Sequence, residues 1–136
     1  GVEATLEVIG GKWKPVILCH LNHHGQIRTN EFRRLIPGIS QKMLTSQLRE
    51  LEQCGLINRK VYNQVPPKVE YSLTPYGHEM EPVLNLLCTW GENHIEKLIE
   101  NPAIGRAGRV LRMRELVITK FPYIDLIKYE TIIFMY

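Results

Sequence analysis

The segment of residues 40–53 has a polar face rich in side chains that donate hydrogen bonds. At about 100° per residue, its apolar side chains fall within one helical arc that is expected to face a core: Met43, Leu44, Leu48 and Leu51. The opposite face carries, at spacings of i, i+3, i+4, i+7 and i+11, Lys42, Thr45, Ser46, Arg49 and Gln53. Such side chains suit base edges and phosphates, as a recognition helix in a major groove requires. An ordinary solvated helix face is the alternative.

The flanking residues predict that this helix is the second of a helix-turn-helix. Thr29 is a natural N-cap for a preceding helix, which must stop at Pro37-Gly38. Ser40 then caps the next helix, so the connection is short. Gly55 stands where a left-handed residue that ends a helix is expected.

A hairpin is predicted directly after the second helix. Residues 56–62 and 69–73 have the composition of two strands, and residues 63–68 form a polar tip that contains proline. A charged hairpin in this position is typical of a wing, whose tip reaches a minor groove or the DNA backbone. From residue 28 to residue 68 there are eight basic and three acidic residues, a difference of +5.

These patterns predict a set of DNA contacts from the helix-turn-helix and the wing. The predicted residues are Arg28, Ser40, Gln41, Lys42, Thr45, Ser46, Arg49, Gln53, Asn63 and Lys68.

Several segments resemble the HxlR branch of the MarR-like bacterial transcription regulators. They agree in order and spacing over roughly residues 1 to 100, and they are residues 3–15 (EATLEVIGGKWKP), 32–40 (FRRLIPGIS), 44–52 (LTSQLRELE), 55–57 (GLI) and 69–74 (VEYSLT). The resemblance implies a mainly α fold with a small β wing, a winged helix-turn-helix with terminal dimerisation helices. It also implies a homodimeric repressor or activator on a two-fold-related DNA operator.

Many members of this family respond to oxidants or electrophiles through a cysteine just before a Val-Glu pair near the N-terminus. The sequence here begins Gly1-Val2-Glu3, so the redox mechanism is not carried over. Of the cysteines, Cys54 at the end of the recognition helix is the candidate redox residue by position. Cys19 and Cys88 lie in helical segments where packing roles are expected.

A long helix is predicted over about residues 74–100, with Pro75 in its first turn. It carries an apolar seam at near-heptad spacing, formed by Leu84, Leu87, Cys88, Gly91, Ile95 and Leu98. A stripe of that length suggests a dimer interface with a partner helix. Packing on the first helices of the same chain is the alternative.

Metal, cofactor and catalytic sites are not predicted. His20 and His24 would share a helix face, but no carboxylate or cysteine in the same turn completes a metal site. A solvated histidine cluster at a helix end is therefore expected. The sequence contains no GxSxG, Walker or dinucleotide motif, so an enzyme is not expected.

The chain of 136 residues suits one winged-helix domain over residues 1–100, followed by an extension over residues 101–136 in which we find no motif. No apolar run approaches the roughly 20 residues of a membrane helix, and a cytoplasmic location is the expectation. The predicted function is sequence-specific DNA-binding transcription regulation, with a response to a small molecule or a redox signal left open. The alternative is a winged-helix protein-interaction module that does not bind DNA. The charge set of Lys42, Arg49 and Lys68 distinguishes the two, because an interaction module does not need it on one face.

Overall fold

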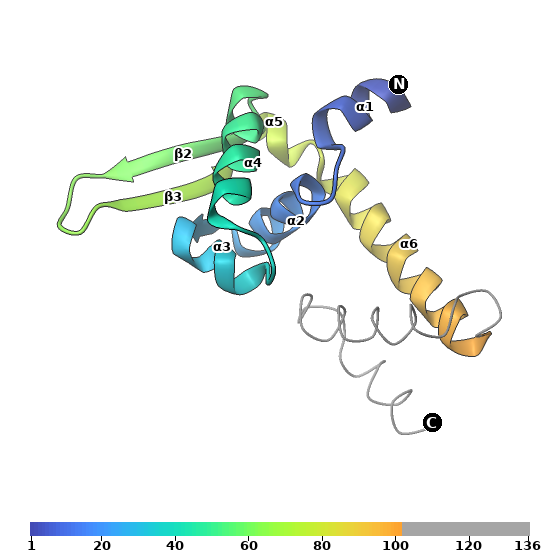
Figure 1. The fold of residues 1–136 in the computed structure, drawn as a ribbon. Helices are drawn as coiled ribbons and strands as arrows, with labels where there is room; N and C mark the ends of the chain where they lie inside the picture. Colours follow the sequence, from blue (N-terminus) through green and yellow to red (C-terminus); the bar gives the residue numbers. More distant parts are fainter. Residues whose placement is uncertain (102–136) are drawn as a thin grey trace. The chain divides into compact units, whose positions relative to one another are not determined.

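The structure is a computed structural model that describes residues 1–101. Residues 1–87 form one compact unit and residues 88–136 form a second. The first unit contains the predicted helix-turn-helix and wing (Figure 1). The predicted extension over residues 101–136 lies, apart from its first residue, outside the described residues.

Four helices open the chain: α1 (Val2–Ile9), α2 (Lys14–His24), α3 (Thr29–Leu35) and α4 (Gln41–Gln53). The predicted short connection between the last two is confirmed, because only residues 36–40 separate them. Ser40 caps α4 as predicted, since the Met43 amide donates to its hydroxyl oxygen at 3.1 Å. Gly55 has the left-handed φ of 73° that was expected after this helix.

The prediction that Thr29 caps α3 is wrong by one residue. Arg28 is the N-cap, and Thr29 is the first residue of the helix. The Arg28 backbone amide donates to the Glu31 carboxylate at 3.0 Å, which satisfies one amide at the beginning of the helix.

A three-stranded antiparallel sheet has the order β1-β3-β2, with β1 (Gln26–Arg28), β2 (Ile57–Tyr62) and β3 (Lys68–Leu73). The hairpin of β2 and β3 extends away from the helices, which is the arrangement of a wing (Figure 1). Strand β1 has only three residues and pairs with β3, so its pattern was too short to be recognised in the sequence.

The two faces of the sheet differ in chemistry. The register pairs Ile27 with Tyr71 and Ile57 with Leu73, and these four side chains are buried. Residues that are paired across strands lie on the same face, and neighbours along a strand alternate. The other face, here called the polar sheet face, consists of Gln26, Arg28, Asn58, Lys60, Tyr62, Lys68, Glu70 and Ser72.

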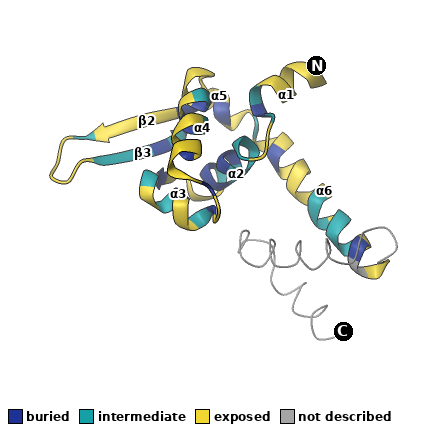
Figure 2. Cartoon of the chain, in the orientation of Figure 1, coloured by how far each residue is buried: buried dark blue, intermediate teal, exposed yellow. Residues whose placement is uncertain are grey.

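One hydrophobic core joins the helices of the first unit to the sheet. Its largest fully buried members include Phe32 from α3, Leu44 and Leu48 from α4, and Ile17 and Leu21 from α2. Burial of each such side chain contributes about 1.5–3 kcal/mol to the folded state. Figure 2 shows that burial is concentrated where these elements meet, while the outer side of α4, most of β2 and the loop of the hairpin are exposed.

The prediction of a single long helix from residue 74 is wrong. The chain instead forms α5 (Pro75–His78) and α6 (Glu81–Glu100). Pro82 explains the interruption, because it has no amide hydrogen to donate to the carbonyl of His78, four residues earlier, and its ring would clash with that carbonyl. Thr74 caps α5, and its hydroxyl oxygen accepts the Gly77 amide at 2.9 Å.

Within residues 1–101, no helix combines the length and the apolar character that crossing a membrane requires.

Candidate nucleic-acid interface

The predicted recognition helix, α4, buries a leucine stripe and exposes a polar face. Leu44, Leu48 and Leu51 are buried in the core, which confirms that part of the pattern. All predicted contact residues of this segment are exposed, namely Ser40, Gln41, Lys42, Thr45, Ser46, Arg49 and Gln53. Met43 is also exposed, so its assignment to the core is wrong. It lies more than a quarter turn from the middle of the leucine stripe, which places it at the rim.

Hydrogen bonds within α4 hold several of the polar side chains in place. The Thr45 hydroxyl donates to the Gln41 carbonyl at 2.9 Å, and the Gln41 side-chain amide donates to Thr45 Oγ1 at 3.4 Å. The Ser46 hydroxyl donates to Glu50 at 3.3 Å. Because that hydrogen points to Glu50, Ser46 presents its remaining lone pairs as acceptors to a ligand.

Glu50 also joins α4 to the beginning of α2. Its carboxylate lies 2.7 Å from the Lys14 ammonium group, whose side chain is largely buried. The hydrogen bond and charge of Lys14, followed by the Ser46 hydroxyl, hold the pKa of Glu50 below its usual value despite an opposing effect of burial. This contact links α4 to α2 in addition to the core packing of the α4 leucines.

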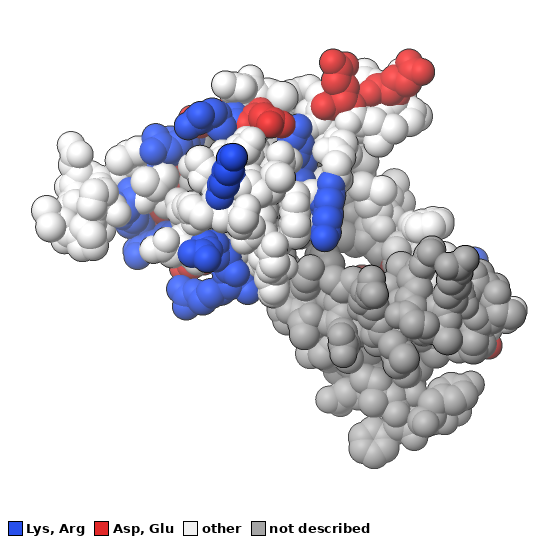
Figure 3. Space-filling model, in the orientation of Figure 1, with Lys and Arg blue, Asp and Glu red and all other residues white. Residues whose placement is uncertain are grey.

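Basic side chains surround α4 on the face drawn in Figure 3. They lie over α3, α4 and the strands of the hairpin, whereas the loop at the tip of the hairpin is uncharged and acidic side chains gather over α1. Besides Lys42 and Arg49, the exposed basic residues of these elements include Arg33, Arg34, Arg59 and Lys60. The sequence prediction counted these four residues in the charge of the segment but omitted them from the contact set.

The tip of the wing differs from the prediction because Lys68 is not part of it. Lys68 is the first residue of β3 and pairs with Tyr62. The loop between the strands consists of residues 63–67, and Asn63 is exposed there as predicted. Positive charge in the wing therefore lies at its strands and not at its tip.

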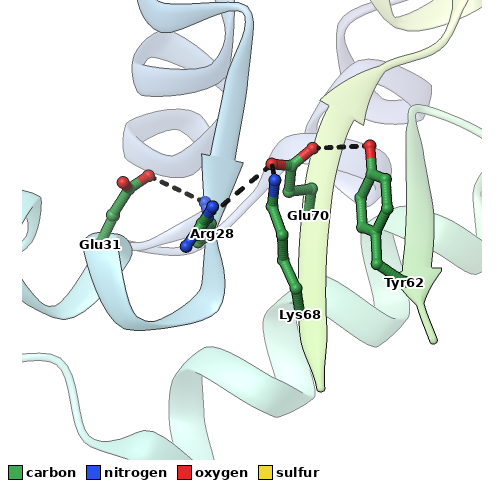
Figure 4. Close-up of polar contacts among 5 residues, drawn as sticks. All are labelled: Arg28, Glu31, Tyr62, Lys68 and Glu70. Carbon is green, nitrogen blue, oxygen red and sulfur yellow. Dashed lines mark hydrogen bonds and ion pairs between the residues drawn. The ribbon is translucent and has the colours of Figure 1, made fainter. Parts of the chain in front are cut away.

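Arg28 and Lys68 meet at one acidic side chain, Glu70 (Figure 4). The Lys68 ammonium group lies 2.5 Å from Glu70 Oε1, and Arg28 Nε lies 3.8 Å from the same oxygen. The Tyr62 hydroxyl donates to Glu70 Oε2 at 3.1 Å. Sequence reasoning missed Glu70, although alternation along residues 68–70 places it on the same face as Lys68.

The predicted dimer seam on α6 is divided between buried and exposed residues. Leu84 and Leu98 are buried, and Leu84 belongs to the core of its own chain. Leu87 and Cys88 are exposed, while Gly91 and Ile95 are half-buried. For Leu84, the alternative of packing within the same chain is therefore the one observed.

A second row of apolar side chains on α6 was not predicted. Leu86 is 70% exposed and Trp90 is 68% exposed, and Val83 and Leu87 lie beside them at helical spacing. This exposed α6 row lies about a quarter turn around the helix from the predicted seam, with Leu87 common to both.

The histidines of α2 do not form the solvated cluster that was expected. His20 is only 1% exposed, whereas His23 and His24 are exposed. Burial, and then the positive charges that His24 and His23 can carry, lower the pKa of His20 to about 4. In the part of the chain that the structure describes, no three metal-ligating side chains come together.

The cysteines occupy three different environments. Cys54 is exposed at the C-terminal cap of α4, Cys88 is exposed on α6, and Cys19 is half-buried against the core. The packing role expected of Cys88, which was also assigned to the predicted dimer seam, stays a prediction.

Comparison with known proteins identifies what the chain resembles. The model of the HxlR-like helix-turn-helix family matches residues 8–99. The uncharacterized HTH-type transcriptional regulator YtcD of Bacillus subtilis (strain 168) is 68% identical over 97 residues, which cover 71% of this chain and 76% of YtcD. A crystal structure of ytcD aligns with a TM-score of 0.67 and 67% identity, covering 70% of this chain and 96% of that one.

A second similar solved structure is that of a redox regulator. The reduced form of the redox regulator HypR aligns with a TM-score of 0.68 and 55% identity, covering 71% of this chain and 95% of that one. The winged-helix fold predicted from the sequence is thus confirmed.

Proposed function

Because this chain belongs to the HxlR-like helix-turn-helix family, whose named relatives are transcriptional regulators, we propose that it binds DNA sequence-specifically as a homodimer on a two-fold-related operator. The observation that carries the proposal is the exposed polar face of α4. Lys42 and Arg49 project from it two turns apart, with Thr45 between them. A helix presented this way can insert into a major groove and place donors at base edges.

The surrounding charge supports contacts to the DNA backbone. Exposed basic residues on α3 and β2 flank α4, including Arg33, Arg34 and Arg59. Side chains of this kind bind phosphates on either side of the groove and set the register of the helix on the duplex. The loop at the wing tip carries no positive charge that would attract phosphates, so we assign the charged phosphate contacts of the wing to its strands.

The exposed α6 row supports assembly into a dimer. Leu86 and Trp90 would lose a large apolar area from water in a contact with a second copy, and contiguous exposed apolar side chains are typical of such interfaces. Helix α1 exposes Val2 and Leu6, which can extend the same kind of contact. A dimer would place two copies of α4 on half-sites about one helical turn apart.

The proposal is tested by titrating the full chain against a duplex from the region upstream of its own gene. The reference is an unrelated duplex of the same length and base composition, measured at the same salt concentrations. We expect the upstream duplex to bind roughly a thousandfold more tightly, with both affinities falling as salt rises. Equal affinity for both duplexes, or no binding to either, would instead favour a protein-interaction module.

HypR is a redox regulator by name, and redox regulation is not part of the function that we propose for this chain.

A further inference from the structure

The polar sheet face brings three basic side chains to one carboxylate. In the strand register, Glu70 of the central strand lies between Arg28 of β1 and Lys60 of β2. Lys68 precedes Glu70 by two residues and therefore points to the same side of the sheet. Three positive charges and one negative charge leave this cluster at +2.

Glu70 is held in this cluster by direct contacts. It binds Lys68 at 2.5 Å, accepts the Tyr62 hydroxyl at 3.1 Å, and lies 3.8 Å from Arg28 Nε. The side chains of Lys68 and Glu70 are only 20% and 13% exposed. Partly buried ion pairs of this kind are screened less by salt than fully exposed ones.

The ring of Tyr62 completes the arrangement. The Lys68 and Lys60 ammonium groups lie 4.6 Å and 4.8 Å from its centroid. A cation at this distance from an aromatic face is attracted by the electrons of the ring. Lys68 is thus restrained by both Glu70 and Tyr62, while Lys60 is exposed beside them.

These contacts have a consequence for DNA binding. Arg28 precedes the first helix of the helix-turn-helix, and Lys68 begins β3 directly after the loop at the tip of the wing. A cation that is already paired with a carboxylate gains less from a phosphate, because the existing pair must be broken or shared. Glu70 thus opposes the phosphate contacts that Arg28 and Lys68 would otherwise make.

We propose that Glu70 is a positioning residue of the DNA-binding surface, which restrains Arg28 and Lys68 and thereby limits the sequence-independent part of DNA affinity. This inference rests on the proposed function. Contacts to phosphate carry no sequence information, so Glu70 alters the affinity for operator and unrelated DNA by similar factors.

The test uses Glu70→Gln, which removes the charge but keeps an oxygen that can accept the Tyr62 hydroxyl. Affinity is measured by fluorescence anisotropy for the upstream duplex and the unrelated duplex over a range of salt concentrations. We expect both duplexes to bind roughly fivefold more tightly, and the slope of log K against log salt to steepen by about one. Glu79→Gln is the matched control, because it removes the same charge from an exposed position after α5.

A second variant keeps the test informative if Glu70→Gln does not fold, which its thermal unfolding curve will show. Lys68→Gln in the otherwise unchanged chain should weaken binding to either duplex by less than about twofold, because Lys68 is already engaged. A tenfold loss in that variant would overturn the proposal.

The remaining outcomes separate failure of the role proposed for Glu70 from failure of the proposed DNA-binding function. Unchanged or weaker affinity in Glu70→Gln, or an equal gain in Glu79→Gln, would overturn the restraining role of Glu70. Failure of the unaltered chain to bind either duplex at any salt concentration would overturn the proposed function itself.

Discussion

Two exposed side chains of α4 provide the sharpest test of how the helix would contact DNA. Lys42→Ala or Arg49→Ala should weaken binding to the upstream duplex by roughly 1–3 kcal/mol if the side chain contacts a base. Loss of a phosphate contact would instead weaken both duplexes alike and reduce the salt slope by about one. Lys97→Ala removes the same charge from an exposed position on α6 and serves as the control. Unchanged binding in both α4 variants would show that another element is the recognition helix.

His20 makes stability depend on pH. Its pKa is lowered to about 4 in the folded chain, so the unfolded chain binds more protons between pH 4 and about 6.5. The contribution is fully present above pH 6.5 and is lost as pH falls towards 4. From this shift, the free energy of unfolding should drop by about 2 kcal/mol between pH 7.5 and pH 5.0. The lowered pKa values of Glu50 and Glu70 act mainly below that window.

Urea unfolding at the two pH values tests this prediction. His20→Leu should abolish most of the difference, because the unfolded chain then no longer gains this proton. His23→Gln removes an exposed histidine of the same helix and should retain most of it. An equal drop in the parent and in His20→Leu would place the pH dependence elsewhere.

The exposed thiol of Cys54 is not expected to control DNA binding. Helix N-termini and nearby cations favour the reactive thiolate, whereas Cys54 lies at the C-terminal end of α4. Binding to the upstream duplex should therefore stay within about twofold after mild diamide or peroxide treatment. A loss of binding that disappears in Cys54→Ser would make Cys54 the sensor.

At the scale of elements, α5 packs closely against the backbone that follows α4. The Thr74 hydroxyl donates to the Gly55 carbonyl at 2.6 Å, and a Cβ atom placed on Gly77 would lie 2.0 Å from the Leu56 carbonyl oxygen. No side chain fits at that distance without a shift of the backbone. The sequence indicated a helix here. The need for glycine at position 77 arises only from its contact with Leu56, the residue just before β2.

Gly77→Ala should consequently destabilise the fold by about 1–3 kcal/mol, as other overpacked sites do. Gly91→Ala is the matched comparison, because its added Cβ meets no atom within 4 Å and α6 gains a better helix former. That variant should be neutral or more stable by up to about 1 kcal/mol. Urea midpoints of both variants check the pair, and equal effects would contradict the close approach at Gly77.

At the scale of the whole molecule, the exposed α6 row is the surface that we expect to form the dimer interface. Leu87 belongs both to this row and to the seam predicted from the sequence, and it is half exposed. Leu87→Glu should yield monomer or aggregate, because a dimer would place two like charges in an apolar contact. Sedimentation velocity at several protein concentrations measures this directly.

Asn85→Glu is the control for that experiment, since Asn85 is exposed on the side of α6 away from the row. It adds the same charge and should leave the dimer intact. An unchanged dimer in Leu87→Glu would move the interface to another surface, such as α1.

The sequence by itself determined the features that depend on neighbouring residues. The Ser40 cap, the left-handed Gly55 and the leucine stripe of α4 were all predicted, because caps, turns and helical periodicity follow from local spacing. The winged-helix fold and the family were predicted from the resemblance, in which several segments agree in order and spacing with HxlR-type regulators. The DNA contacts of α4 stay a prediction, and the exposure of the residues that would make them agrees with it.

Only the tertiary structure decided the features that depend on distant segments. Leu84 faces the core of its own chain, His20 is buried, and Glu70 pairs with Lys68 and Arg28. A stripe in the sequence shows that a helix has an apolar side, but not which other surface covers each residue. That choice is made when strands and helices from different parts of the chain come into contact, since burial and ion pairing depend on distances in space.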